Sequence, residues 1–199
     1  MPRYRTVVFD CDSTLSAIEG IDELAVDCRA DVARLTDAAM RGEIPLEEVY
    51  GRRLRLVQPT RSAMEALARE YVARLVPDAS ETIAALRRAG VDVRILSGGL
   101  RPAVLAVAMA VGVPATHVAA VDISFGADGS YVDFDDASPL AVSGGKRIAI
   151  ERLRCRGCSS SSLRFFHRCL SGLFGYPAFA IAFRGAAEFL LVPETIVCG

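Results

Sequence analysis

Several features that define other classes of protein are missing from this sequence of 199 residues. Its longest late apolar stretch, residues 169–183, contains two glycines and a proline. It is shorter than the roughly 20 apolar residues that a membrane-spanning helix needs. The N-terminus leads into a β-branched run without the apolar segment of a secretory signal. The six cysteines have irregular spacings, which is typical of reduced thiols. We therefore expect a cytoplasmic protein without a membrane anchor.

The sequence also has no surplus of charge of either sign. Its 23 basic and 24 acidic residues give a formal net charge of −1, which excludes a nucleic-acid binder of the electrostatic kind. Disorder is excluded because 52% of the residues are hydrophobic. This length suits one domain, or one domain with an insertion. Lysine is nearly absent, since every basic residue except Lys146 is an arginine.

The order of expected elements indicates an α/β protein. Residues 4–9 form a β-branched and aromatic run that is typical of a buried strand. Residues 16–75 are helical in composition, and glycines and prolines at 42, 45, 51 and 59 are expected to divide them into short helices. Strands and helices then alternate, which predicts a parallel sheet with crossover helices. These later elements are a helix at 77–88, a strand at 91–96, a tight turn at 97–99, a helix at 102–111 and strands at 118–125 and 131–134.

The segment FDCDSTL (residues 9–15) holds the strongest chemical signal. Asp10 and Asp12 stand at the end of a predicted buried strand, where α/β sheets bind ligands. Two like charges this close need a shared cation or proton, and Mg²⁺ suits them because it prefers oxygen ligands. Asp10 can then act as a nucleophile on phosphorus, and Asp12 as general acid and base. An ordinary Asp-Ser-Thr turn is the alternative interpretation.

Two further segments contain groups that suit a phosphate. Residues 97–99 (Ser-Gly-Gly) follow a predicted strand, and their small size lets backbone N–H groups approach a phosphate closely. Residues 143–146 (Ser-Gly-Gly-Lys) place Lys146 before a predicted helix, where its ammonium can neutralise phosphate charge. An ordinary turn and a solvated surface lysine are the simpler interpretations. Together with the two carboxylates, the segments favour phosphoryl transfer.

These three motifs, in this order and spacing, resemble the haloacid dehalogenase superfamily of phosphatases. The segments SAIEGIDELA (16–25), AMRGEIPL (39–46), RLRLVQP (53–59) and the closing SGGK are similar to those of phosphoserine phosphatases. The resemblance covers about residues 4–154. It implies a Rossmann-like core, residues 1–15 and 76–199, with a helical cap at 16–75. It also implies hydrolysis of O-phospho-L-serine to L-serine and phosphate through an aspartyl phosphate, the last step of serine biosynthesis.

The resemblance implies roles for the residues of the core. Asp10 is implied to be the phosphorylated nucleophile and to bind Mg²⁺ through its side chain. Asp12 is implied to be the general acid and base and to bind Mg²⁺ through its backbone carbonyl. The phosphoryl group is implied to be held by Ser97, Gly98, Gly99 and Lys146.

In the cap, the resemblance implies that Glu19 meets the substrate ammonium and Arg53 its carboxylate, with Met40 and Gly42 in the pocket wall. Opposite fixed charges can recognise the two charged groups of a small zwitterion. The simpler interpretations are an acid at a helix start for Glu19, a surface arginine for Arg53 and a core residue for Met40. A phosphatase for another small phosphate is a further alternative, and charge reversal at Glu19 or Arg53 discriminates it. The expected partner is a small molecule, phosphoserine, and the sequence leaves a homodimer open.

The last 45 residues depart from this pattern. Charged residues fall from about 27% of residues 1–154 to about 13% of residues 155–199, and no aspartate follows Asp136. The family has a fourth motif there, whose first aspartate completes the Mg²⁺ site. We do not expect His167 to replace it, because Mg²⁺ favours oxygen ligands. A changed reading frame or a diverged tail explains the composition. We expect the sheet to lack a proper strand at this position. The alternative function is an inactive relative that keeps only the phosphate and amino-acid pocket.

Overall fold

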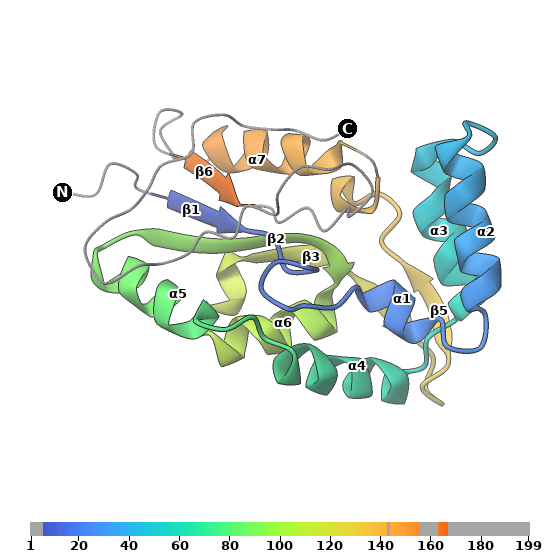
Figure 1. Ribbon diagram of the computed structural model, residues 1–199, viewed down its shortest axis with the longest axis horizontal. Coiled ribbons are helices and arrows are strands. Elements are labelled where there is room, and N and C mark those ends of the chain that lie inside the picture. Colours follow the sequence, from blue (N-terminus) through green and yellow to red (C-terminus); the bar gives the residue numbers. More distant parts are fainter. Residues whose placement is uncertain (1–5, 143, 156–162, 167–199) are drawn as a thin grey trace.

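A parallel sheet forms the centre of the computed structural model, which describes residues 6–142, 144–155 and 163–166. The strands in spatial order are β3 (Val118–Val121), β2 (Asp92–Leu100), β1 (Thr6–Phe9) and β6 (Leu163–Phe166). The central strand β1 pairs with β2 on one side and with β6 on the other, both in parallel (Figure 1). The predicted α/β class is confirmed.

Helices cover both faces of this sheet because successive residues of a strand point to opposite faces. Val7 and Ile95 belong to one apolar cluster, to which α5 (Ala79–Arg88) and α6 (Arg101–Ala110) contribute. Their neighbours Val8 and Leu96 belong to a second cluster, against which residues of α7 (Gly145–Cys155) pack. Figure 1 shows α7 on one side of the sheet and α5 and α6 on the other.

The chain between β1 and α5 forms four helices. They are α1 (Gly20–Leu24), α2 (Arg29–Met40), α3 (Leu46–Val57) and α4 (Arg61–Ala73). The two ends of this helical segment lie side by side, where Ser16 forms an antiparallel bridge with Leu75. Helices α2 and α3 pack on each other at one side of the core, whereas α4 packs against α6 (Figure 1). The division into a core and a cap at 16–75 stays a prediction.

A hairpin reaches from the core sheet toward α3 (Figure 1). It consists of β4 (Ile123–Phe125) and β5 (Tyr131–Phe134), which pair antiparallel. Phe134 of this hairpin meets Tyr50 of α3 with a ring-centroid distance of 5.5 Å. Short 3-10 turns at Ala115–His117 and Pro139–Ala141 complete the described elements. The hairpin therefore supports one side of the inserted helices.

Three local predictions were wrong. Ser97 to Gly99 do not form a tight turn but continue β2, and neither glycine has a positive φ. The expected strand 118–125 is interrupted at Asp122, whose carboxylate accepts a hydrogen bond from Arg101 Nε at 2.6 Å. Gly51 lies inside α3 rather than between helices. A Cβ there would approach Phe134 to 3.2 Å, so the glycine provides space for the hairpin.

The expectation that the sheet lacks a strand after residue 155 was also wrong. Residues 163–166 form β6 and pair with β1 from Thr6↔Leu163 to Phe9↔Phe166. Backbone pairing on the second edge of β1 needs no particular side chain, which is why the unusual composition did not exclude it. The other predictions for the tail, including that for His167, lie outside the described residues.

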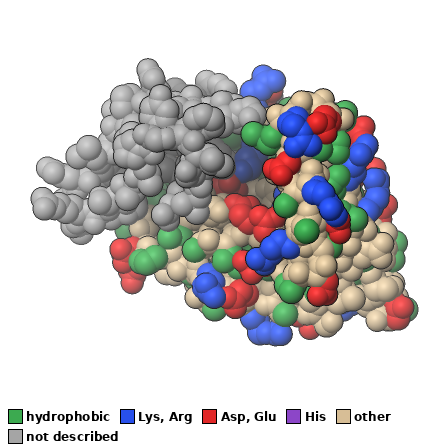
Figure 2. All heavy atoms as spheres, turned by 45° about the vertical axis from the view of Figure 1, so that its right-hand side comes forward, with side chains coloured by type: hydrophobic (Ala, Val, Ile, Leu, Met, Phe, Trp, Pro, Cys, Tyr) green, Lys and Arg blue, Asp and Glu red, His purple; other side chains and the backbone are tan. Residues whose placement is uncertain are grey.

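The surface matches the balanced composition. Figure 2 shows acidic and basic side chains interspersed on one face of the molecule, with no extended area of one sign. Within the described ranges, no helix is long and apolar enough to cross a membrane.

Candidate active site

Asp10 lies at the C-terminal end of β1 and is almost completely buried, with 2% of its surface exposed. Its Oδ2 atom is 2.6 Å from Nζ of Lys146, at the start of α7. Its Oδ1 atom accepts the backbone N–H of Cys11 at 2.9 Å. The fold therefore joins two predicted site residues that are 136 positions apart. A buried carboxylate needs such a partner, because a charge without one is costly in the interior.

The loop after Asp10 forms a tight turn over residues 11–16. The Cys11 carbonyl accepts hydrogen bonds from the N–H groups of Leu15 and Ser16 at 2.9 and 3.0 Å. Ser13 has a φ of 52°, in the left-handed region that few residues other than glycine adopt. Backbone strain of this kind is concentrated at functional sites. The turn holds Asp12 two residues after Asp10, the nucleophile candidate.

Asp12 is in a different environment from Asp10. The hydroxyl of Tyr71, from α4, donates a hydrogen bond to Asp12 Oδ1 at 2.7 Å. Burial raises the pKa of Asp12 from its ordinary value of 3.8 to about 7. The hydrogen bond from Tyr71 opposes this shift, and the charge of Glu19 adds to it. A carboxyl group with a pKa near neutrality can both donate and accept a proton at physiological pH.

The Ser-Gly-Gly segment at the end of β2 lies next to Asp12. Ser97 is fully buried, and its Oγ accepts the N–H of Gly99 at 2.9 Å. A Cβ at Gly99 would lie 2.9 Å from Asp12 Oδ1. The glycine is therefore required by this close approach rather than by a turn. The Gly98 carbonyl accepts a hydrogen bond from the Tyr50 hydroxyl at 2.8 Å, which connects α3 to β2.

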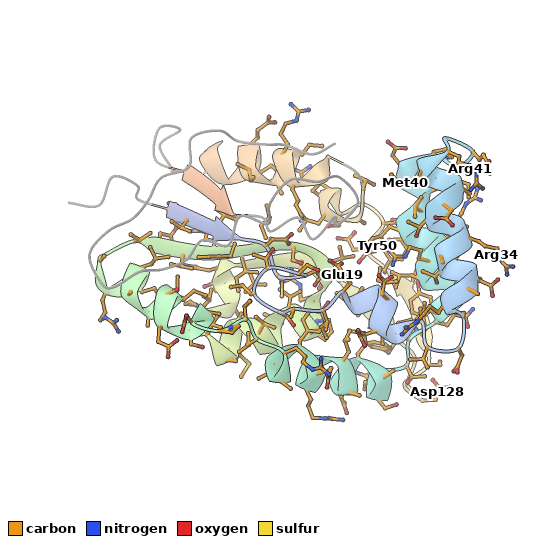
Figure 3. All side chains as sticks on the ribbon, in the orientation of Figure 1. Glu19, Arg34, Met40, Arg41, Tyr50 and Asp128 are labelled. Atoms are coloured by element: carbon orange, nitrogen blue, oxygen red, sulfur yellow. The ribbon has the colours of Figure 1, made fainter. Side chains whose placement is uncertain are left out.

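Two charged residues predicted to recognise the substrate lie on the inserted helices and the loop before them. Glu19 is exposed and accepts a hydrogen bond from the Ser13 hydroxyl, so it lies beside the loop that follows β1. Arg53 of α3 pairs with Asp22 of α1. Its Nε is buried and has no hydrogen-bond partner among the described residues. Figure 3 shows Glu19 and Tyr50 between the sheet and the helices α2 and α3.

The remaining two predicted site residues lie at the far end of α2. Met40 ends that helix and is 79% exposed. Gly42 has a φ of 74°, and a Cβ there would meet no atom within 4 Å. Figure 3 shows Met40 beside Arg41, away from Glu19. The structure therefore brings eight of the ten predicted residues to the region where the sheet and inserted helices meet, and leaves these two at its outer margin.

Two tyrosines of this region were missed by sequence reasoning. Tyr50 and Tyr71 lie in helices where an aromatic residue is an ordinary part of an apolar face. Their hydroxyls bond to groups 48 and 59 positions away in the chain. The one local signal was the position of Tyr50 three residues before Arg53, which places both on one face of a helix.

A cavity of about 310 Å³ lies between α3 and the segment after β5. Its lining residues are Glu47, Glu48, Gly51, Arg55, Phe134, Asp136, Ala141 and Val142. None of the ten predicted site residues lines it, so it is a neighbour of the candidate site rather than the site itself.

The donors at the end of β1 fit a Mg²⁺ ion that also binds a substrate phosphate. Mg²⁺ takes one or two carboxylates together with phosphate oxygens and water. Asp10 offers a carboxylate, and the Asp12 carbonyl offers a second oxygen two residues later. Among the residues that the structure describes, no three His, Cys, Asp or Glu side chains are grouped to hold a metal by themselves.

Comparison with known proteins identifies the class to which this fold and site belong. The family model of haloacid dehalogenase-like hydrolases matches residues 4–153. The chain therefore belongs to the haloacid dehalogenase-like hydrolases. The match ends where the composition of the sequence changes, in agreement with the predicted limit near residue 154.

Within this family, the proteins that the chain is similar to include phosphoserine phosphatases. The chain is 39% identical over 150 residues to phosphoserine phosphatase of Homo sapiens, which covers 74% of this chain and 67% of that protein. It is 39% identical over 150 residues to the chloroplastic phosphoserine phosphatase of Arabidopsis thaliana, covering 74% and 51% of the two chains. The chain thus spans about half to two thirds of the length of these two relatives. A solved phospho-aspartyl intermediate analogue of phosphoserine phosphatase has a TM-score of 0.65 and 25% identity, covering 82% and 78% of the chains.

Proposed function

We propose that this chain hydrolyses O-phospho-L-serine to L-serine and inorganic phosphate through a phosphorylated Asp10. The buried Asp10 carboxylate, held at 2.6 Å by Lys146 and followed by Asp12 with its raised pKa, is the observation that supports this most directly. Identity to phosphoserine phosphatases supports this substrate. It does not support the alternative of an inactive relative that keeps only a pocket.

The reaction proceeds in two steps, phosphoryl transfer to Asp10 and hydrolysis of the resulting aspartyl phosphate. In the first, a carboxylate oxygen of Asp10 attacks phosphorus and the bond from phosphorus to the seryl oxygen breaks. Asp12 gives its proton to that oxygen and releases serine. In the second, water attacks the phosphorus of the aspartyl phosphate and passes a proton to Asp12. The bond to Asp10 breaks, inorganic phosphate leaves and both side chains return to their starting states.

The surrounding residues stabilise charge on the phosphoryl group. The Lys146 ammonium lies beside the Asp10 carboxylate, where it can also bind a phosphoryl oxygen. Ser97, Gly98 and Gly99 form the neighbouring end of β2, where hydroxyl and N–H groups suit the same oxygens. Mg²⁺, held by Asp10 and the Asp12 carbonyl, would offset the repulsion between the phosphate and the attacking carboxylate. Enzymes of this family generally use Mg²⁺.

The inserted helices supply the groups that recognise an amino acid. Glu19 offers an anion for the ammonium of phosphoserine, and Arg53 offers a guanidinium for its carboxylate. The buried Arg53 Nε without a hydrogen-bond partner among the described residues supports a bound anion at this position. Met40 and Gly42 lie at the outer margin of this region, and their assignment to the wall of the pocket stays a prediction. A small-molecule substrate in the cytoplasm completes the proposal, and we retain a homodimer as an arrangement to test by size-exclusion chromatography.

The decisive experiment measures phosphate release from phosphoserine by the purified chain with Mg²⁺ or with a chelator. We expect Mg²⁺-dependent release, and we expect Asp10→Asn to lower kcat by at least about 1,000-fold because the nucleophile is lost. Asp27→Asn, the same change at an exposed aspartate, is the control and should retain activity. A folded wild-type chain that releases no phosphate, or an Asp10→Asn variant that remains active, would contradict the proposal.

A further inference from the structure

Tyr71 lies in the interior of α4 with its side chain completely buried and its hydroxyl directed at Asp12. Its backbone is also held, because the Ser16 hydroxyl donates to the Tyr71 carbonyl at 3.0 Å. A phenol has an ordinary pKa of about 10 and is neutral at physiological pH, so the Tyr71 hydroxyl acts as the donor toward Asp12 Oδ1 at 2.7 Å.

We propose that Tyr71 is a positioning residue, which fixes the orientation of the Asp12 carboxyl group for proton transfer; this inference rests on the proposed phosphatase function. Because Oδ1 accepts the hydrogen bond from the Tyr71 hydroxyl, the exchangeable proton of Asp12 belongs on Oδ2. That proton moves from Oδ2 to the seryl oxygen when the ester bond breaks. In the second step, a proton of the attacking water returns to Oδ2. Tyr71 keeps its own proton throughout and touches neither substrate nor phosphorus.

Two glycines form the space in which this contact is made. A Cβ at Gly20, the first residue of α1, would overlap the Tyr71 hydroxyl oxygen and lie 3.1 Å from the ring carbon that bears it. A Cβ at Gly99 would lie 2.9 Å from Asp12 Oδ1, on β2. Both glycines therefore leave space for this hydrogen bond, because a side chain at either position would displace the Tyr71 hydroxyl or the Asp12 carboxyl group. The hydrogen bond restricts rotation of the carboxyl group by holding Oδ1 against the Tyr71 hydroxyl.

The dependence of the rate on the leaving group tests this role. An alkoxide such as that of serine leaves only when it is protonated, whereas p-nitrophenolate is stable without a proton. We expect Tyr71→Phe to lower kcat for phosphoserine by about 10- to 100-fold, a part of the usual contribution of general acid catalysis, with KM changed by less than about threefold. In the same variant, the rate of the pre-steady-state burst of p-nitrophenol from p-nitrophenyl phosphate should fall by less than about threefold.

Tyr131→Phe is the matched control, because the Tyr131 hydroxyl has no hydrogen-bond partner among the described residues. Tyr131→Phe should leave the rates of hydrolysis of phosphoserine and p-nitrophenyl phosphate unchanged. Gly20→Ala provides a second test that does not alter the tyrosine. It should slow phosphoserine hydrolysis in the wild type. Its effect on kcat should be clearly smaller in the Tyr71→Phe background, where the oxygen that the new methyl group meets is absent.

The outcomes separate this inference from the proposed function. An unchanged kcat in Tyr71→Phe, or an equal loss with both leaving groups, would overturn the positioning role while phosphoserine hydrolysis by the wild type stands. A wild type that hydrolyses β-glycerophosphate but not phosphoserine overturns the proposed substrate, and the comparison then uses that alkyl ester. A wild type inactive on all three esters overturns both.

Discussion

At the scale of single residues, two aspartates two positions apart have different electrostatic environments. Asp10 is paired with the Lys146 ammonium at 2.6 Å. Asp12 receives a hydrogen bond from a neutral phenol, and its burial raises its pKa to about 7. Two carboxyl groups with separate environments can take separate roles in one reaction, as nucleophile and as proton donor. The difference also has a measurable consequence for stability.

We predict that Asp12→Asn stabilises the metal-free protein at pH 8. The folded pKa of Asp12, about 7, is above its ordinary value of 3.8. The folded state therefore holds the proton more tightly, so Asp12 lowers stability as pH rises from about 3.8 to about 7, and the full loss persists above that range. Asparagine has no charge to bury and keeps an acceptor for Tyr71.

Thermal unfolding with chelator present should show the Tm of Asp12→Asn a few degrees above that of the wild type at pH 8. The difference should shrink as the pH falls through this range and vanish near pH 4. Asp27→Asn, at an exposed position, should show no such trend. A constant difference between Asp12→Asn and the wild type at all pH values would contradict the prediction.

At the scale of elements, α3 is the helix that links the segment between β1 and α5 to the end of β2 at the candidate site. Tyr50 donates to the Gly98 carbonyl of β2 and meets Phe134 of β5, so one side chain joins three elements. Arg53 follows three residues later on the same face of the helix. Its neighbour Arg52 instead pairs with Glu48 at the surface. Two adjacent arginines thus face different surroundings.

We predict that Arg53→Glu lowers kcat/KM for phosphoserine by about 100-fold, because it replaces a cation that would bind the substrate carboxylate with an anion that repels it. Hydrolysis of p-nitrophenyl phosphate, which carries no such carboxylate, should change by less than about threefold. Arg52→Glu makes the same charge reversal one residue away and should leave the ratio of the two activities unchanged. If Arg53→Glu leaves that ratio unchanged as well, its assigned role is wrong.

At the scale of the whole molecule, the sheet includes β6, a strand from the C-terminal segment whose composition differs from that of residues 1–154. β1 carries Asp10 at its end and lies between β2 and β6. Without β6, the second edge of β1 would present unpaired N–H and C=O groups. Such edges promote pairing with other chains. The strand that carries Asp10 therefore pairs with residues 163–166, which lie beyond the region matched by the family.

We predict that a chain ending at residue 155 is less stable than one ending at residue 166. Both lack the segment after β6, and they differ in whether β1 has its second partner. The shorter chain should have a Tm several degrees lower and should associate as its concentration rises, measured by thermal unfolding and light scattering. Equal Tm values for the two chains would show that β6 does not contribute to the sheet.

The sequence by itself determined the features that depend on local patterns. β-branched runs predicted strands, and alternation with amphipathic helices predicted a parallel sheet. Because the carboxyl ends of such strands meet at one edge, residues 9–15 and 97–99 could be placed together before the structure was known. The Ser-Gly-Gly-Lys segment before a predicted helix also marked Lys146, the single lysine, as a candidate partner for a phosphate. The elements followed from local patterns, and the meeting of distant segments followed from the geometry that all parallel sheets share.

Tertiary structure alone decided the environment of those groups. The hydrogen bonds from Tyr50 to Gly98 and from Tyr71 to Asp12 join residues 48 and 59 positions apart, and no local pattern specifies such partners. The raised pKa of Asp12 depends on burial by several elements at once. Strand β6 depends on backbone pairing, which composition does not reveal. The sequence thus located the chemical groups, and packing set their charge and orientation, because burial and contact are properties of the assembled fold.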